Sequence, residues 1–263
     1  NISSDFQEVA GMFGLHIGNV YLCSVINIES MRKYILIFWV LGLLAIGANP
    51  LQAQHRADRQ NLENENSFSM IVLGDPQGYT KYDINQPIFE LCTAWIADNV
   101  EHLNIKAVLC TGDMVEQNEN ITMNRKMLNQ TSREMWESAS RSMARLDGKV
   151  PYIISGGNHD YGYKKAENSR TNLPEYFPFE RNSCWRDCLV TDFPNRNGDI
   201  SMENAAFEFH DKNWGDILVI TTEFAPRPEV LDWARELACS DKYKEHKVIA
   251  MTHSYLKHRS AEY

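Results

Sequence analysis

The sequence predicts an α/β fold in which a mostly parallel β-sheet is wrapped by helices. The first observation behind this prediction is alternation: short apolar runs alternate with longer segments whose apolar residues recur at helical spacing. The second is that the first two apolar runs both end in Gly-Asp, as buried strands do where they run into a loop. The third is composition, because 43% apolar and 23% charged residues are typical of an ordinary globular protein.

Five apolar runs are expected to form strands, and three segments with helical spacing are expected to form helices. The strands are expected within residues 68–75, 105–113, 149–160, 216–224 and 246–255. The helices are expected within residues 86–100, 132–148 and 228–240. Gly148 occupies the position just past the second helix where glycine is favoured, and the third helix starts at Pro228.

Residues 161–213 interrupt this alternation and are expected to form an irregular insertion. The segment is rich in Asn, Pro, Arg and aromatic residues, as in PEYFPFERNSCWRDC. Long irregular segments in compact domains are usually functional or disordered, and the aromatic content argues against disorder. We therefore expect an ordered cap beside the functional site that selects substrate. The alternative is a peripheral elaboration that makes no substrate contact.

The N-terminal part is expected to direct export. Residues 31–53 combine a short basic start, an apolar run and small residues before Gln54, which is the pattern of a secretory signal peptide. A transmembrane anchor is the alternative, but the apolar run is shorter than the roughly 20 residues of a spanning helix. Residues 1–30 are then upstream sequence outside the mature protein, and residues 54–67 form a flexible lead-in. We expect an exported, periplasmic or extracellular protein that meets the membrane only through its transient signal peptide.

The charge of the chain argues against one class of partner, and its cysteines allow one disulfide. The net charge of −9 argues against nucleic acid as a partner, since that interaction needs a basic surface. It does not exclude small phosphorylated substrates, because a bound metal supplies local positive charge. In an oxidising compartment Cys184 and Cys188 could close a small disulfide loop, although two unrelated thiols are equally compatible with the sequence.

Polar side chains follow four of the expected strands at the point where each strand ends. These residues are Asp75, Asp113, the run Asn158–Asp160, and His253. In open α/β sheets the carboxyl ends of the strands line the crevice where ligands bind, so the four clusters are expected to converge. Each has an ordinary structural alternative. The acids and Asn158 are common in turns and caps, and a lone histidine is often an interior residue.

The motifs at these positions resemble those of the calcineurin-like metallophosphoesterases. They are DPQ at 75–77, GD at 112–113, GNHD at 157–160 and THS at 252–254. The resemblance covers roughly residues 68–255, within a domain expected to span 68–263. It implies a four-layer α/β/β/α sandwich that holds two divalent metal ions, and the segments around residues 223–238 and 252–256 resemble exported bacterial members.

The resemblance also implies roles for individual residues. Asp75 would bind the first metal ion and Asp113 would bridge both ions. Asn158 and His253 would bind the second ion. His159 would not bind metal but would stabilise or protonate the leaving oxygen, and Asp160 would orient its imidazole.

The sequence departs from the family pattern in two places. Gln77 stands where the first motif usually has histidine; its amide oxygen either ligates or stays outside the coordination shell. Among Mn, Mg, Fe and Zn, an oxygen donor there favours Mn or Mg, and Mn is the expected cofactor.

The terminal G-H-x-H motif is absent, so the sequence resembles a family member whose C-terminal part is missing. Other histidines are expected to be ordinary, with His210 in a strand or turn and His246 and His258 solvated.

These features predict an enzyme that uses metal-activated water to hydrolyse phosphate esters, either a phosphatase or a phosphodiesterase. The expected substrate is a small phosphate ester or a phosphoprotein. The alternative is a non-catalytic relative that binds metal or a phosphate ligand through a degenerate site.

Overall fold

The computed structural model describes residues 61–120 and 128–254. The expected upstream segment 1–30, the expected signal peptide 31–53 and His258 lie outside the described residues. Within the described ranges, no helix is both long enough and apolar enough to cross a membrane.

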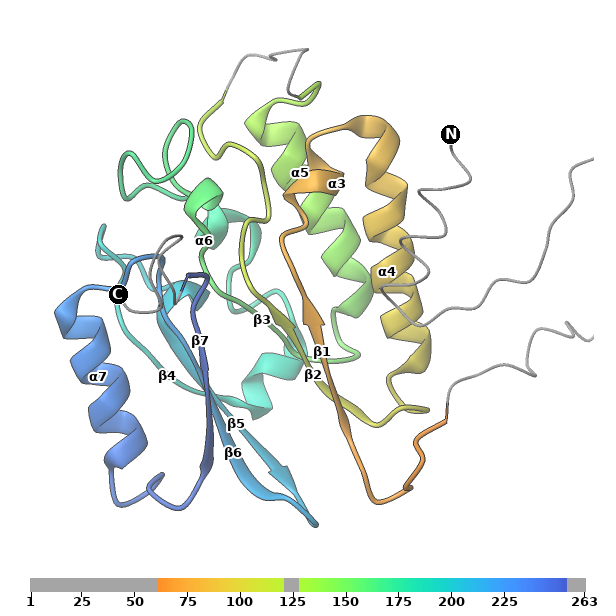
Figure 1. The fold of residues 1–263 in the computed structure, drawn as a ribbon, viewed down its shortest axis with the longest axis vertical. Coiled ribbons are helices and arrows are strands. Elements are labelled where there is room, and N and C mark those ends of the chain that lie inside the picture. The colour runs from red at the N-terminus through yellow and green to blue at the C-terminus, as the bar shows by residue number, and fades with distance from the viewer. Residues whose placement is uncertain (1–60, 121–127, 255–263) are drawn as a thin grey trace, which may run out of the picture. The chain divides into compact units, whose positions relative to one another are not determined.

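The first sheet is fully parallel (Figure 1). Most of the predicted site residues follow the ends of its strands. Its order is β1-β2-β3, with β1 at Ser69–Leu73, β2 at Ile105–Cys110 and β3 at Tyr152–Ile154. The central strand β2 is buried along nearly its whole length, which explains its continuous apolar sequence. The registers pair Leu73 with Cys110 and Cys110 with Ile154, so the three strands end level with one another.

The second sheet is mixed and has the order β4-β5-β6-β7. Its strands are β4 at Leu189–Asp192, β5 at Ala205–Asp211, β6 at Gly215–Thr221 and β7 at Lys247–Met251. The first three strands are antiparallel neighbours, and β7 runs parallel to β6. The expectation that residues 161–213 are irregular throughout is therefore wrong, because β4 and β5 lie inside this segment.

The three longer helices occur at nearly the predicted positions, whereas the two short helices were not predicted. The longer ones are α4 (Gln86–Asn99), α5 (Ser132–Met143) and α7 (Pro228–Cys239); the short ones are α3 (Gln77–Thr80) and α6 (Leu173–Tyr176). Single 3-10 turns cover Asp83–Asn85, Ala144–Leu146, Asn158–Asp160, Ser183–Asp187 and Met202–Asn204. Thr131 begins α5 with a capping box: the Glu134 carboxylate accepts from the Thr131 amide at 2.7 Å.

The elements form the four-layer α/β/β/α arrangement that was expected (Figure 1). Side chains of β5 and β6 alternate between two faces, as the period of two in a strand requires. Phe207 and Val219 face the large core that also contains the first sheet and α4 and α5. Ala206 and Leu218 face the opposite side and pack with α7. The sheets are thus stacked on each other, with helices outside both.

Two side-chain contacts join the sheets at their carboxyl edges. The Ser155 hydroxyl, just past β3, donates to the carbonyl of Thr222, just past β6, at 3.1 Å. The imidazole Nδ1 of His253, just past β7, lies 2.9 Å from the carbonyl of Thr111, just past β2. Residues that follow four strands, two from each sheet, therefore meet in one place.

Candidate metal centre

Asp75, Asp113 and His253 form the centre of this convergence. One carboxylate oxygen of each aspartate and one ring nitrogen of the histidine all lie within 4.8 Å of one another. Asp75 is exposed, Asp113 is buried and His253 is half-buried, so the group opens to solvent on one side. Carboxylate and imidazole together suit Mn, Fe and Zn.

Both aspartates sit on a left-handed backbone. Asp75 has a φ of 30° and Asp113 a φ of 52°, and each directly follows the glycine at the end of its strand. Non-glycine residues in this region are uncommon, and such strain concentrates at functional sites. The left-handed conformation turns the chain sharply at the strand end, so that each carboxylate is presented at the edge of the sheet.

Close backbone packing holds Asp113 against the loop after β3. A Cβ added to Gly157 would lie 2.2 Å from the Asp113 amide nitrogen and 2.3 Å from its Oδ1. A Cβ on Gly112, whose φ is 102°, would lie 2.5 Å from the Gly157 nitrogen. Only glycine fits at either position. The two glycines of the predicted motifs are therefore required for the approach of two loops.

Asp113 is a buried carboxylate with donors on both oxygens. Its Oδ1 accepts from the backbone amide of His159 at 2.8 Å, and its Oδ2 accepts from the Gln77 side-chain amide at 3.1 Å. Burial nevertheless raises the pKa of Asp113 above its ordinary value, and the nearby Asp75 charge adds to this. A cation at this position would offset the cost of keeping the carboxylate ionised.

His253 is oriented as metal-binding histidines are. Because a carbonyl oxygen only accepts, the Thr111 contact assigns the proton to Nδ1 and leaves Nε2 with a lone pair. That Nε2 lies 3.1 Å from the Asn158 amide oxygen and 3.5 Å from Asp113 Oδ2. Three electron-pair donors thus face one another, which is the arrangement a cation satisfies.

Gln77 lies at the same centre. Its backbone amide donates to the Asp113 carbonyl at 2.8 Å, and its side-chain nitrogen reaches the Asp113 carboxylate. Its amide oxygen is buried and has no hydrogen-bond partner within the described part of the chain. Buried polar atoms are rarely left unsatisfied, so this oxygen fits an additional ligand for a cation. Ligation by Gln77 stays a prediction.

His159 lies beside the centre but its ring is held elsewhere. Its Nδ1 is 2.7 Å from the carbonyl of Glu116, which assigns the Nδ1 proton to that bond. The Glu116 carboxylate in turn pairs with Lys81 at 2.8 Å. The ring therefore keeps Nε2 for a ligand, while the His159 amide supports Asp113.

The expectation that Asp160 orients the His159 imidazole is wrong. The Asp160 carboxylate accepts from the backbone amides of Gly157 at 2.9 Å and Val115 at 3.2 Å. The single 3-10 turn at Asn158–Asp160 points these neighbouring side chains in different directions. Burial raises the pKa of Asp160 well above its ordinary value. Asp160 fixes the loop, and Glu116 orients the histidine.

Other sequence expectations had mixed outcomes. His210 lies in β5 as expected, with its Nδ1 2.5 Å from Asp216. His246 was expected to be solvated, but its side chain is only 7% exposed and its Nε2 contacts Glu208 at 2.9 Å. Cys184 and Cys188 are both free thiols.

Sequence reasoning missed two residues of the centre. Thr111 and Glu116 both act through backbone carbonyls, and a backbone carbonyl leaves no mark in residue identity. Their only sequence signal is position, since both flank the Gly-Asp motif after β2.

The donor set as a whole fits a divalent cation. Asp75, Asp113, Asn158 and His253 supply carboxylate, amide and imidazole donors, and Gln77 adds an unpartnered oxygen. Every one of these donors was singled out in the sequence, and the structure brings them together.

Comparison with known proteins agrees with this geometry. The family profile described as calcineurin-like phosphoesterase matches residues 68–263. The chain is also similar to the uncharacterized protein YvnB of Bacillus subtilis, with 26% identity over 194 residues. That alignment covers 72% of this chain and 13% of YvnB, so the chain spans about an eighth of that relative's length.

Proposed function

Because the chain belongs to the calcineurin-like phosphoesterase family, whose members are in general metal-dependent phosphoester hydrolases, we propose that this protein hydrolyses phosphate esters. The observation that carries the proposal is the group formed by Asp75, Asp113 and His253, with Asn158 facing the same ring nitrogen. The proposed substrate is a small phosphate ester or a phosphoprotein. Nucleic acid is not proposed, because the chain carries a net charge of −9.

The proposed cofactor is a pair of divalent cations, with Mn favoured. Asp75, Asp113, Asn158, His253 and Gln77 would hold them, Asp113 between both. Bound cations of this kind lower the pKa of water and offset negative charge on the phosphoryl oxygens. The neutral amides of Asn158 and Gln77 add oxygen donors without adding charge, and such oxygen donors favour Mn or Mg over Zn.

His159 is proposed as the residue that protonates the leaving oxygen. Its Nδ1 proton is committed to the Glu116 carbonyl, so the protonated ring carries a second proton on Nε2. The backbone bond from His159 to Asp113 fixes the distance between this proton donor and the metal-binding carboxylate. Transfer of the Nε2 proton to the departing oxygen prevents the build-up of alkoxide or phenoxide charge.

The experiment is an assay of the protein at its full natural length. With added Mn we expect hydrolysis of p-nitrophenyl phosphate or bis-p-nitrophenyl phosphate, and loss of the activity after treatment with EDTA. Restoration by Mn, compared with Mg and Zn, tests the metal preference. Metal binding without hydrolysis of a broad panel of mono- and diesters would reject the enzyme in favour of the non-catalytic binder.

Export is proposed from the sequence alone, through the signal-peptide pattern at residues 31–53. The expected result is a secreted or periplasmic protein whose N-terminus, read by Edman degradation or mass spectrometry, is Gln54. A membrane-bound protein that retains residues 31–53 would contradict cleavage and favour the anchor.

A further inference from the structure

A cavity of about 360 Å³ lies beside the metal centre. Its lining residues come from the segment after His159 and from the loops after β4 and β6: Tyr161, Ala166, Glu167, Asn168, Ser169, Arg196, Phe224 and Ala225. Phe224 is the shared wall, since its ring centroid lies 6.0 Å from that of His253. Cavities of this size hold small organic ligands. The cavity is therefore next to the metal centre at which an ester would react.

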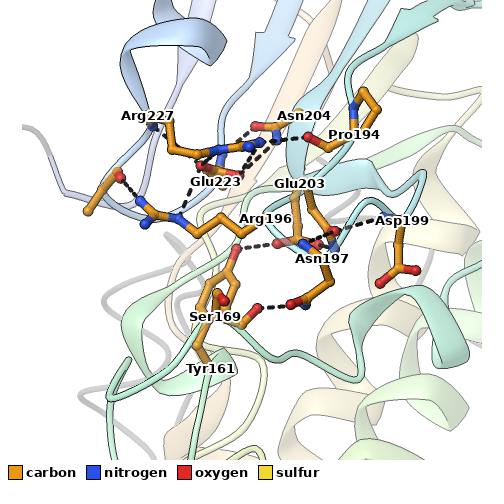
Figure 2. A network of polar contacts seen from close by, with 12 residues as sticks. Tyr161, Ser169, Pro194, Arg196, Asn197, Asp199, Glu203, Asn204, Glu223 and Arg227 are labelled. Atoms are coloured by element: carbon orange, nitrogen blue, oxygen red, sulfur yellow. Dashed lines mark hydrogen bonds and ion pairs between the residues drawn. The ribbon is translucent and has the colours of Figure 1, made fainter.

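Arg196 is the cationic residue that lines this cavity, and the buried Glu223 carboxylate and a backbone carbonyl fix its position (Figure 2). Its Nε lies 3.3 Å from Glu223 Oε1, and its Nη2 donates to the Ala225 carbonyl at 2.6 Å. Glu223 is 1% exposed and is itself held by Asn204 at 3.0 Å and by Arg227 at 2.8 Å. Arg196 Nη1 has no hydrogen-bond partner among the described residues. Glu223 and the Ala225 carbonyl therefore set the orientation of the guanidinium, and Nη1 remains as a donor for a ligand.

A second buried carboxylate fixes the other wall of the cavity. Glu203 accepts from the Tyr161 hydroxyl at 2.5 Å and from Asn195 Nδ2 at 2.9 Å (Figure 2). Burial raises the pKa of Glu203 above its ordinary value. These bonds tie the residue that follows the GNHD motif to the loop that carries Arg196. The cavity is thus built from a connected polar network and not from loose surface loops.

The charges around the cavity favour an anion. Glu167 is the lining carboxylate, and it accepts from the backbone amides of Lys164 and Lys165 at 2.9 and 3.0 Å. The side chains of these two lysines and of Arg170 are exposed on the same loop. Both bonds go to Oε2 of Glu167, and the Glu119 carboxylate accepts from the lining residue Asn168 at 3.1 Å. Together with Arg196, these loops carry four cations against two carboxylates. In Figure 2 the Asp199 carboxylate points away from Arg196.

We propose that this cavity binds an anionic group carried by the leaving group of the substrate, with Arg196 as the binding residue. The substrate class is a phosphate ester with a second negative charge, either a carboxylate or a second phosphate, at its far end. Both anions match the planar donor edge of a guanidinium. The inference rests on the proposed function, since it names the substrate class of the same centre.

The test compares esters that differ only in the remote group. The probes are 4-carboxyphenyl phosphate, 1,4-phenylene bisphosphate and the neutral 4-carbamoylphenyl phosphate, together with the corresponding biphenyl series, which extends the reach. We expect kcat/KM for the anionic members of at least one series to exceed that of the neutral member about tenfold, as one charge-assisted hydrogen bond supplies. Comparison of kcat/KM for the carboxylate ester and the bisphosphate shows which anion the cavity prefers.

Arg196→Gln is expected to remove this preference through a higher KM for the anionic esters, with a smaller effect on kcat/KM for 4-carbamoylphenyl phosphate. The matched control is Arg235→Gln, an exposed arginine on α7 that pairs with Asp232 at 2.8 Å away from the cavity. In calorimetry, Arg196→Gln should also weaken binding of the non-hydrolysable 4-phosphonobenzoate, and Arg235→Gln should not.

The outcomes separate this inference from the proposed function. Equal kcat/KM for charged and neutral esters in both series, with p-nitrophenyl phosphate hydrolysed, overturns the Arg196 assignment and leaves the proposed function standing. Hydrolysis of no ester overturns the proposed function. In that case reduced binding of 4-phosphonobenzoate by Arg196→Gln still supports the anion site, and unchanged binding rejects it.

Discussion

Replacement of His159 by alanine is expected to lower kcat for esters with poor leaving groups by about 10²- to 10⁴-fold, the usual contribution of a general acid. The imidazole is held by the Glu116 carbonyl, and its Nε2 is left for the departing oxygen. Among the described residues, no hydrogen bond or ion pair joins its side chain to Asp75 or His253. Metal content should therefore stay close to that of the unaltered protein.

Leaving-group dependence separates this role from simple damage to the site. p-Nitrophenolate departs without protonation more readily than phenolate, so p-nitrophenyl phosphate should lose less activity than phenyl phosphate. The measurements are kcat for both esters and metal analysis of the same samples. The control is His210→Ala, an exposed histidine in β5 paired with Asp216. Equal losses for both esters, accompanied by loss of metal, would show that His159 holds metal instead.

The location of the centre was predictable because its cause is visible in the sequence. Parallel strands end at one edge of a sheet, and Gly-Asp after β1 and β2 places a carboxylate at that edge. Gly112 and Gly157 belong to the motifs on which the centre was predicted, but the reason that both must be glycine comes from the structure. The left-handed conformation of Asp75 and Asp113 was not visible, and at Asp113 it accompanies the tight approach of two distant loops.

The errors also have identifiable physical causes. Ala205, Phe207 and Phe209 alternate with polar or small residues in β5, so a period-two pattern was present in the sequence. The aromatic and Asn-rich residues before it obscured this pattern, and β4 has only four residues. The role of Asp160 was carried over from the family resemblance, and a motif match does not specify which group the carboxylate contacts. In the 3-10 turn at Asn158–Asp160, the His159 ring bonds to the backbone carbonyl of Glu116, and the Asp160 carboxylate bonds to backbone amides instead.

The docking of the two sheets decides whether the centre exists. His253 follows β7 in the second sheet, whereas Asp75 and Asp113 follow β1 and β2 in the first. The bond between the His253 ring and the Thr111 carbonyl crosses this interface and also fixes the tautomer. Sheet packing and ligand chemistry are thus coupled through one hydrogen bond. The centre is therefore formed only when the sheets are docked.

Replacement of Asp113 by asparagine is expected to abolish stabilisation by metal without destabilising the metal-free protein. Burial disfavours the ionised carboxylate, so a neutral amide removes that cost. The asparagine oxygen can still accept from the His159 amide, and the Gln77 amide can turn so that its unpartnered oxygen accepts from the new amide nitrogen. A cation loses its central anionic ligand at the same time.

Thermal unfolding with EDTA and with Mn measures both effects. A ligand at 100 times its Kd stabilises the unaltered protein by about 2.7 kcal/mol, and this increment should disappear in Asp113→Asn. In EDTA, the midpoint temperature of thermal unfolding of Asp113→Asn should be equal to or higher than that of the unaltered protein. The control is Asp232→Asn on α7, an exposed aspartate away from the centre, which should keep the Mn-dependent increment. A full increment in Asp113→Asn would mean that the cation is held elsewhere, whereas a lower midpoint in EDTA would mean that the carboxylate stabilises the fold by its own hydrogen bonds.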